Sequence, residues 1–242
     1  MDRTIRSEFR KVRTTRSALS LLAGLIALSV AATWAAAAQA SPAELATALT
    51  RPDALLAIVI ALPVFVAVLG IRSYTDEVRH GSVVTTFLAT PARRRVLAAK
   101  SFVAGAVSAA FGAIAMLVGV ATVVAYGAAH HAALTIDVAM IATLFAKVLV
   151  LAPAWGVIGV AIGVVIRQQV AAIVGLLVWM LIGEGLLSGA VPALTRWLPA
   201  QSAIIGLGFD DGTFSLVAAV VAVGWIAAAQ LLAAVMVQRD VV

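Results

Sequence analysis

Residues 75–100 read TDEVRHGSVVTTFLATPARRRVLAAK and separate two long apolar stretches of the chain. Charged groups lie at both ends of this stretch, with Glu77 near its start and three consecutive arginines, residues 93–95, near its end. A charged interruption between two apolar runs is typical of a loop between membrane spans. The stretch therefore predicts a chain that crosses a membrane more than once.

The middle of this stretch has the pattern of a short amphipathic helix. Val83, Phe87 and Leu88 recur at helical spacing and place apolar side chains on one face. Gly81 permits a tight turn before this helix, and Pro91 ends it. The apolar face either rests on lipid or docks on a cytoplasmic protein, and the pattern alone leaves both possibilities open.

Composition places the whole chain among membrane proteins. Of its 242 residues, 63% are hydrophobic and only 12% are charged, and the mean hydropathy is +1.10. A soluble domain of this size would expose too much apolar surface. There is no cysteine, which excludes disulfides, thiolate metal sites and a cysteine nucleophile. The net charge of +6 does not by itself indicate a nucleic-acid partner, and we expect none.

Six apolar segments are long enough to cross a bilayer, which needs about 20 residues for a 30 Å core. We expect them to form one transmembrane domain over residues 1–242. The predicted spans are residues 18–38, 54–71, 101–126, 138–165, 170–187 and 214–237. Residues 200–207 are apolar but too short to cross, so they predict an interfacial or re-entrant segment between the last two spans. The fold class is an all-α polytopic membrane protein.

The distribution of basic residues predicts the orientation. Of the 17 Lys and Arg residues, 14 fall in segments that six spans would place on one side, and three fall on the other. Cytoplasmic loops carry the excess of Lys and Arg. Both termini and residues 72–100 are therefore expected in the cytoplasm, with the segment at 200–207 on the outer side.

Residues 1–16 predict an amphipathic helix on the membrane surface. Ile5, Phe9 and Val12 share one face, and six basic residues surround it. A frayed basic tail that only fixes orientation is the alternative.

Glycines within the spans predict close contacts between helices. Gly105, Gly112 and Gly119 repeat every seven residues and share one face, and Gly159 and Gly163 have the GxxxG spacing. We expect both sets to form packing seams, within one subunit or between two.

Candidate chemistry inside the spans is confined to Glu184, an acid well inside an apolar run. Such a group is a site hypothesis by default, either in a translocation pathway or as a proton site. The structural alternative is a carboxylate that caps a helix or pairs with Arg196. The sequence has neither the GxxxxGK[ST] nucleotide motif nor the HExxH zinc motif, so an enzyme is not expected.

The charged stretch resembles the region between the second and third spans of the membrane subunits of type-2 ATP-binding-cassette exporters. That family has an acid, a Gly-Thr pair, a small residue before proline, then arginine and Ala-Lys. The matching positions here are Glu77, Arg79, Gly81, Ser82, Pro91, Arg94 and Lys100. Ser82 departs mildly from the commoner threonine. The basic N-terminal helix, the six spans, the acid late in span five and the Leu198-Pro199 pair are also similar to the family.

The resemblance implies a permease subunit without an ATPase of its own. Such subunits pair, with a second copy or a related chain, and work with two cytoplasmic ATPase subunits that bind ATP and Mg, so this chain would bind no cofactor. It also implies efflux across the plasma membrane through the seam between permease subunits. The residues expected to couple the chain to the ATPase are Glu77, Arg79, Gly81, Val83, Phe87, Leu88, Pro91, Arg94 and Lys100. The three apolar ones are assigned from their helical pattern.

A second hypothesis comes from another class of protein. The chain would be an ATP-independent transporter, or a membrane scaffold, that uses Glu184. No polar constellation in the spans specifies a substrate, and drugs, lipids and peptides all remain compatible with the apolar seam.

Overall fold

A computed structural model describes residues 2–14, 16–49, 53–82, 92–209 and 213–239 of the chain. Within these ranges every regular element is a helix, and six helices are long and apolar enough to cross a membrane. They are Ser17–Gln39, Leu55–Arg79, Arg93–Ala129, Val138–Ile166, Gln169–Ala190 and Leu216–Arg239. The prediction of an all-helical, multi-pass membrane protein is confirmed at this level.

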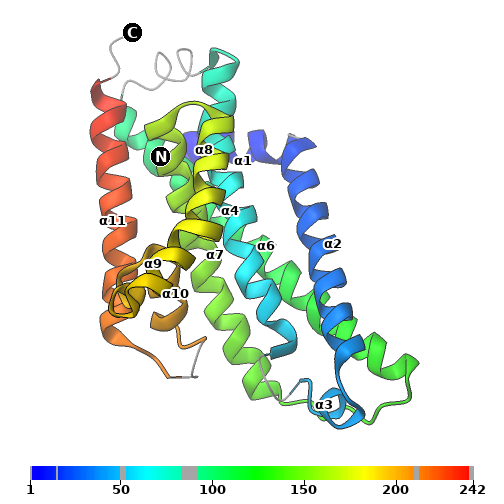
Figure 1. The fold of residues 1–242 in the computed structure, drawn as a ribbon. Coiled ribbons are helices and arrows are strands. Elements are labelled where there is room, and N and C mark those ends of the chain that lie inside the picture. Colours follow the sequence, from blue (N-terminus) through cyan, green and yellow to red (C-terminus); the bar gives the residue numbers. More distant parts are fainter. Residues whose placement is uncertain (1, 15, 50–52, 83–91, 210–212, 240–242) are drawn as a thin grey trace.

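Figure 1 shows the long helices running side by side, with shorter helices at their ends. The first half of the chain contains α1 (Asp2–Thr14), α2 (Arg16–Gln39), α3 (Pro42–Ala46), α4 (Asp53–Arg79) and α6 (Arg93–Ala129). The second half contains α7 (Val138–Ile166), α8 (Gln169–Val178), the π-helical turn η1 (Trp179–Gly183), α9 (Glu184–Ala190), the 3-10 helix η2 (Pro192–Trp197), α10 (Pro199–Gly206) and α11 (Leu216–Arg239).

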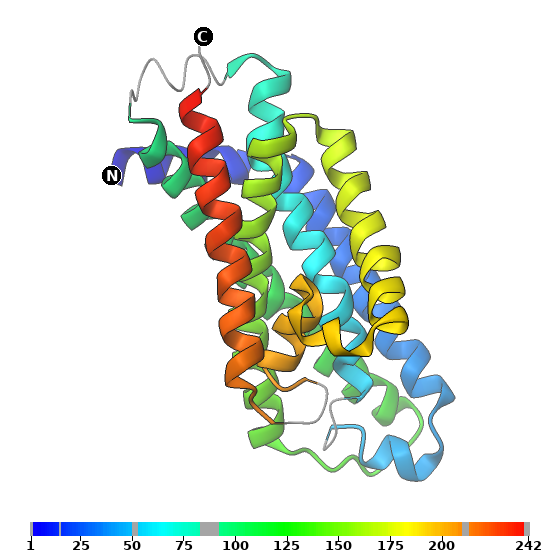
Figure 2. The same cartoon turned by 60° about the vertical axis from the view of Figure 1, so that its left-hand side comes forward.

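Helix α1 lies crosswise to the long helices, near the same end of the bundle as the last turn of α11 (Figure 2). It forms within the stretch where the sequence predicts an amphipathic helix. Its apolar positions divide between two environments: Val12 packs against the core, whereas Phe9 is exposed. The apolar face predicted for this helix is therefore only partly buried: Val12 faces the bundle and Phe9 does not.

The charged stretch differs from its prediction at both ends. Helix α4 continues past the predicted end of span two at residue 71 and ends at Arg79, and α6 begins at Arg93 rather than at residue 101. The arginines at 93–95 thus lie in the first turn of a helix and not in a loop. A buried ion pair between Glu77, in the last turn of α4, and Lys100, about two turns into α6, joins the two extended helices. Gly81 has φ +69°, the left-handed backbone that ends α4 and that glycine adopts without strain.

The opposite end of the bundle contains a helix that we did not predict. Ser41 and Glu44 form a reciprocal capping box at the start of α3, between the first two predicted spans. Leu49 then pairs with Ile136 in an isolated parallel bridge, and Asp137 caps α7 through the amides of Ala139 and Met140. These local bonds order the connections at this end.

Span five is not one continuous α-helix. The π turn η1 interrupts it between α8 and α9, directly before Glu184. The chain then turns through η2 into α10, which packs against α11 (Figure 2). The short apolar segment predicted at residues 200–207 is therefore helical over nearly the same residues.

Helices α4 and α7 approach most closely at glycines. A methyl group on Gly159 would overlap the backbone carbonyl of Ala67, and one on Gly163 would lie 2.7 Å from the carbonyl oxygen of Ile71. Gly70 on α4 makes the reciprocal contact with the backbone at Gly156. Small residues let helix backbones pack closely, which is a main source of association in lipid.

The seven-residue glycine repeat of α6 faces other helices of the same chain. Gly105 lies against Pro153 and Val157 of α7, with the nearest side-chain atom 3.5 Å from a built Cβ. Gly112 lies against Val148, Ala152 and Leu62, and Gly119 against Ile58, Leu55 and Thr33. Of the two possibilities left open by the sequence, these contacts correspond to the seam within one subunit.

Replacing Gly159 by alanine should destabilise the bundle, because its new methyl group meets backbone rather than a movable side chain. We expect a loss of about 1–3 kcal/mol, typical of an overpacked core. The matched control is Gly175→Ala in α8, where a built Cβ has no atom within 4 Å. That change should be neutral or stabilise the helix by about 0.5–1 kcal/mol. Thermal unfolding in detergent measures both, and equal midpoints for the two variants would contradict the close α4–α7 packing.

Candidate functional site

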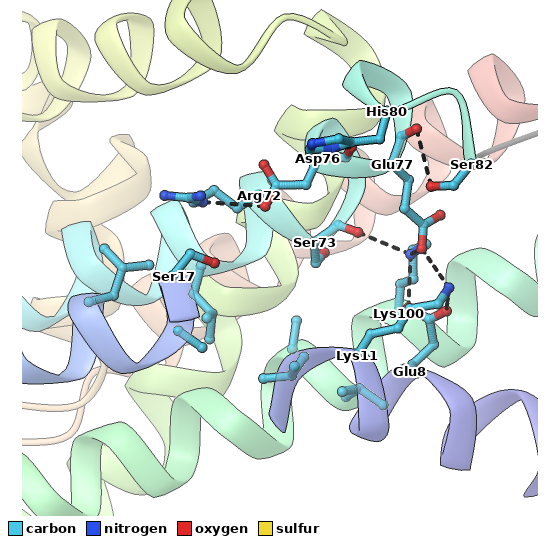
Figure 3. A pocket seen from close by; sticks show the side chains of 16 residues that line it. Glu8, Lys11, Ser17, Arg72, Ser73, Asp76, Glu77, His80, Ser82 and Lys100 are labelled. Carbon is cyan, nitrogen blue, oxygen red and sulfur yellow. Dashed lines mark hydrogen bonds and ion pairs between the residues drawn. The ribbon is translucent and has the colours of Figure 1, made fainter. Parts of the chain in front are cut away.

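Four charged side chains form a closed ring beneath the end of α4 (Figure 3). The Lys100 Nζ atom lies 2.8 Å from Glu8 Oε2 and 2.7 Å from Glu77 Oε1. The Lys11 Nζ atom lies 2.6 Å from Glu8 Oε1 and 2.6 Å from Glu77 Oε1. Positive and negative groups therefore alternate around the ring, and its formal charge is zero.

Three separate helices supply the ring. Glu8 and Lys11 are three residues apart on α1, so they share the face that α1 turns toward the bundle. Glu77 lies in the last turn of α4, and Lys100 lies about two turns into α6. The ring thus ties the crosswise helix α1 to the two helices that flank residues 83–91.

Burial makes these contacts strong. The Lys100 side chain is 1% exposed, and those of Glu8 and Glu77 are 6% and 10% exposed. The Lys100 ammonium donates its third hydrogen bond to the Ser73 carbonyl oxygen at 3.0 Å, so its donors are satisfied. An isolated buried charge would cost several kcal/mol, and the ring removes that cost only while all its members remain in place.

Glu8 and Lys11 lie on α1, outside the membrane-spanning helices, and the contacts of the ring shift the pKa of both groups. Burial raises the pKa of the Glu8 carboxyl, but the ammonium groups of Lys100 and Lys11 outweigh burial and hold this pKa below its ordinary value. Burial lowers the pKa of the Lys11 ammonium, but its bonds to Glu77 and Glu8 outweigh burial and hold this pKa above its ordinary value. Both shifts favour the charged forms, and so the docked α1.

Among the residues predicted to couple the chain to a partner, the structure brings Glu77 and Lys100 into direct contact. Arg79 is exposed at the end of α4, and Gly81 forms the turn that follows. The remaining predicted positions, Val83, Phe87, Leu88 and Pro91, lie outside the described residues.

Arg94 and its neighbour Arg93 contact the end of α11. The Arg93 Nη1 atom donates to the Val237 carbonyl oxygen at 3.3 Å, and Arg94 Nη2 donates to Gln238 Oε1 at 3.3 Å. Cations near a helix C-terminus interact favourably with its exposed carbonyls and dipole. The arginine cluster therefore joins the start of α6 to the end of the chain.

Glu8 and Lys11 are the ring members that sequence reasoning missed. Lys11 was counted only as one of six basic residues, and Glu8 was not considered. The available signal was an acid and a base three residues apart on a helix that is otherwise basic. That pattern does not reveal their partners, which lie 66 and 92 residues further along the chain.

Glu184 caps the short helix α10. Its carboxylate accepts hydrogen bonds from the backbone N–H of Ala200 at 2.9 Å, from that of Gln201 at 3.1 Å, and from Trp179 Nε1 at 3.1 Å. The residue is 1% exposed. In the described part of the chain Glu184 forms no ion pair with Arg196, so the predicted pairing is wrong and the predicted capping is right. The carboxylate satisfies two amides that the start of a helix leaves without partners.

No group of three or more metal-ligating side chains occurs in the part of the chain that the structure describes. His130, one of the two adjacent histidines that follow α6, instead stacks on Tyr126 with ring centroids 4.1 Å apart.

The ring predicts a large cost for removing its buried cation. Lys100→Met leaves two buried carboxylates with only the half-exposed Lys11, so we expect a loss of about 3–5 kcal/mol in unfolding free energy. The control is Arg95→Met, an exposed cation in the first turn of the same helix, which should change stability by about 0.5 kcal/mol or less. Adding Glu8→Gln and Glu77→Gln to Lys100→Met should recover much of the loss. Denaturant unfolding in detergent measures the unfolding free energy of each variant. Equal losses in Lys100→Met and Arg95→Met would contradict the ring.

The pKa shifts predict a pH window for the docking of α1. The pKa of Glu8 is depressed, so its contribution is complete above its ordinary value of 4.5 and is lost as the pH falls through the lower folded value. The pKa of Lys11 is raised, so its contribution is complete below its ordinary value of 10.5 and is lost as the pH rises through the higher folded value. Docking should therefore be tightest between pH 4.5 and 10.5.

A spin label at Arg6→Cys measures this docking, because the chain has no other cysteine. The mobility of this label should rise at both pH extremes, whereas that of a label at Ala133→Cys, in the loop between α6 and α7, should not change with pH. A label at residue 6 whose mobility is independent of pH would contradict the role of Glu8 and Lys11.

The two polar sites lie at different levels of the bundle: the four-residue ring beside α1, and the Glu184 cap at the start of α10.

Comparison with known protein families finds none that matches the chain, and comparison with curated proteins finds no match. In the part of the chain that the structure describes, six helices are long and apolar enough to span a membrane, as in a multi-pass, all-helical membrane protein.

Proposed function

We propose that this chain is the membrane subunit of an ATP-driven exporter of the type-2 ATP-binding-cassette class. Two permease subunits would form the translocation path, and separate cytoplasmic ATPase subunits would hydrolyse ATP with Mg. The chain itself has no motif that cradles nucleotide phosphates. Residues 76–95 would receive the motion of the ATPase.

The charged ring is the observation that carries this proposal. Glu77 and Lys100 lie on either side of residues 83–91 and are joined by a buried ion pair of 2.7 Å. Glu8 and Lys11 extend the same contacts to α1. A force applied to the segment between α4 and α6 would therefore move three helices together rather than bend one loop. That behaviour is what an element needs in order to transmit work from a partner.

The orientation required by the proposal follows from charge. Helix α1, the end of α4, the start of α6 and the end of α11 lie toward one end of the bundle (Figure 1). Segments at this end hold most of the Lys and Arg residues. By the positive-inside rule this end would face the cytoplasm of the cell, where an ATPase could reach it.

The proposed second permease copy would pack on exposed apolar helix faces. Helix α11 exposes Leu216, Val220 and Val223, and α8 exposes Val174 and Val178. These faces suit either lipid or a second membrane subunit. The proposal assigns part of this surface to the second copy.

The alternative hypothesis, an ATP-independent transporter or a membrane scaffold that uses Glu184, has weaker support. Three hydrogen-bond donors surround the Glu184 carboxylate, and two of them belong to the backbone of α10. A carboxylate held in this way has an evident structural role. The alternative hypothesis predicts a proton-driven flux in vesicles that contain no ATPase, and this flux should be lost in Glu184→Gln.

The test is copurification with an ATPase and its loss in one variant. Phe87→Asp should abolish ATPase binding and export, because a charge would replace an apolar contact on the expected docking face. Ala133→Asp places the same charge on an exposed loop at the opposite end of the bundle and is the control. Both variants should insert in the membrane and unfold at wild-type temperatures.

Survival of both ATPase binding and export in Phe87→Asp would refute the proposed coupling. Flux in vesicles that contain only this chain, driven by a proton gradient and abolished by Glu184→Gln, would establish the alternative instead.

A further inference from the structure

A cavity of about 280 Å³ opens beside the charged ring, between α1, α2, α4 and α6 (Figure 3). Its walls are of two kinds. Leu21 and Leu69 belong to the apolar part, and Arg72, Asp76 and Glu77 belong to the polar part. A cavity with one apolar and one charged wall suits an amphiphile better than a small polar metabolite.

One atom of Glu77, a residue that lines this cavity, lacks a partner. Lys11 and Lys100 both contact Glu77 through Oε1, at 2.6 Å and 2.7 Å. The second carboxylate oxygen, Oε2, is buried and accepts no hydrogen bond from the described residues. A buried carboxylate oxygen without a donor is costly, and such atoms call for an explanation such as an ordered water or a ligand. The chemistry that Oε2 needs is an N–H or O–H donor.

The guanidinium group of Arg72 also lines this cavity, closer to the start of α4 than Glu77. Arg72 forms an ion pair with Asp76, but the Nε–Oδ2 distance of 3.5 Å is long for a charge-assisted hydrogen bond. Arg72 precedes Glu77 by five residues, which is about 7.5 Å along a helix axis. A ligand with an acceptor at one end and a donor at the other can therefore contact both groups.

The charges of the lining select among such ligands. Three cationic side chains, Lys11, Arg72 and Lys100, face three carboxylates, Glu8, Asp76 and Glu77. A lining with no net formal charge favours a zwitterion over an anion. Helix α1, which lies crosswise to the long helices (Figure 2), contributes Glu8, Lys11 and Val12 to the lining. A crosswise amphipathic helix is typical of the headgroup region of a bilayer.

We propose that this cavity binds a phospholipid with a phosphoethanolamine headgroup. Its primary ammonium donates to Glu77 Oε2, its phosphate accepts from Arg72, and its glycerol and first acyl carbons lie on Leu21 and Leu69. The bound lipid completes the contacts of the carboxylate that anchors the ring. This site is independent of any ATPase, so its failure would leave the proposed function untouched.

The N-methylation series of phosphatidylethanolamine tests the proposal, because each methyl group removes one N–H donor without removing the positive charge. The purified full-length chain is placed in nanodiscs that contain equal amounts of phosphatidylethanolamine, its mono- and dimethyl forms, and phosphatidylcholine. Lipids retained after detergent extraction are counted by native mass spectrometry. The mono- and dimethyl forms still carry an N–H donor and should be retained like phosphatidylethanolamine. Phosphatidylcholine has none, and its retention should be about tenfold lower, as expected for the loss of one charge-assisted hydrogen bond.

A pair of variants assigns that preference to the cavity. Arg72→Gln removes the phosphate contact without touching the four members of the ring, and it should reduce retention of phosphatidylethanolamine. Arg79→Gln removes a cation from the exposed end of the same helix, outside the cavity lining, and should retain the lipid as the wild type does. The spin label at residue 6 reports whether α1 stays docked in each variant.

Soluble glycerophosphoethanolamine separates the lipid from its free headgroup. It should compete only weakly, because it lacks acyl chains for the apolar wall. Equal retention of phosphatidylethanolamine and phosphatidylcholine would overturn the proposal, as would equal lipid loss in the two arginine variants. Competition by the soluble compound at the affinity of the lipid would overturn the assignment to a phospholipid.

Discussion

The buried ammonium of Lys100 is the constraint on which this end of the protein depends. A lysine that is 2% exposed cannot remain charged there without counter-ions. Its two carboxylates are distant in the chain, because Glu77 is 23 residues away and Glu8 is 92 residues away. Helix α1 must therefore dock and α4 must continue to its last charged turn before α6 can bury this residue. One buried charge thus sets the relative positions of three helices.

The rest of the bundle divides its polar and apolar contacts by position. Glycines bring α4 and α7 into backbone contact through the middle, where polar groups would be expensive. Toward the end opposite the charged ring, buried polar groups bond to backbone rather than to other charges. Glu184 caps α10, and Lys147 donates to the Gly208 carbonyl oxygen at 2.5 Å, which holds the connection into α11. The end with the ring is joined by ion pairs and the opposite end by backbone hydrogen bonds.

The charged ring and the Glu184 cap have different structural effects. The Glu184 cap satisfies donors within one short region of the chain, so it stabilises that region. The ring instead couples α1, α4 and α6, which are distant in sequence. The proposed coupling to an ATPase and the proposed lipid site both depend on this coupling of the three helices. A lipid bound beside Glu77 and a partner that moves residues 83–91 would act on the same ion pairs.

The sequence by itself determined the class of protein, the number of spans, the approximate position of each and the faces of α6 and α7 that carry glycine. These properties follow from local hydropathy and from periodicity along one helix. Only the tertiary structure decided that α4 and α6 extend into the charged stretch, that Glu8 and Lys11 complete the ring, and that Glu184 caps α10. Charges and carboxylates find their partners through the packing of distant helices, and no spacing within a single segment encodes that packing.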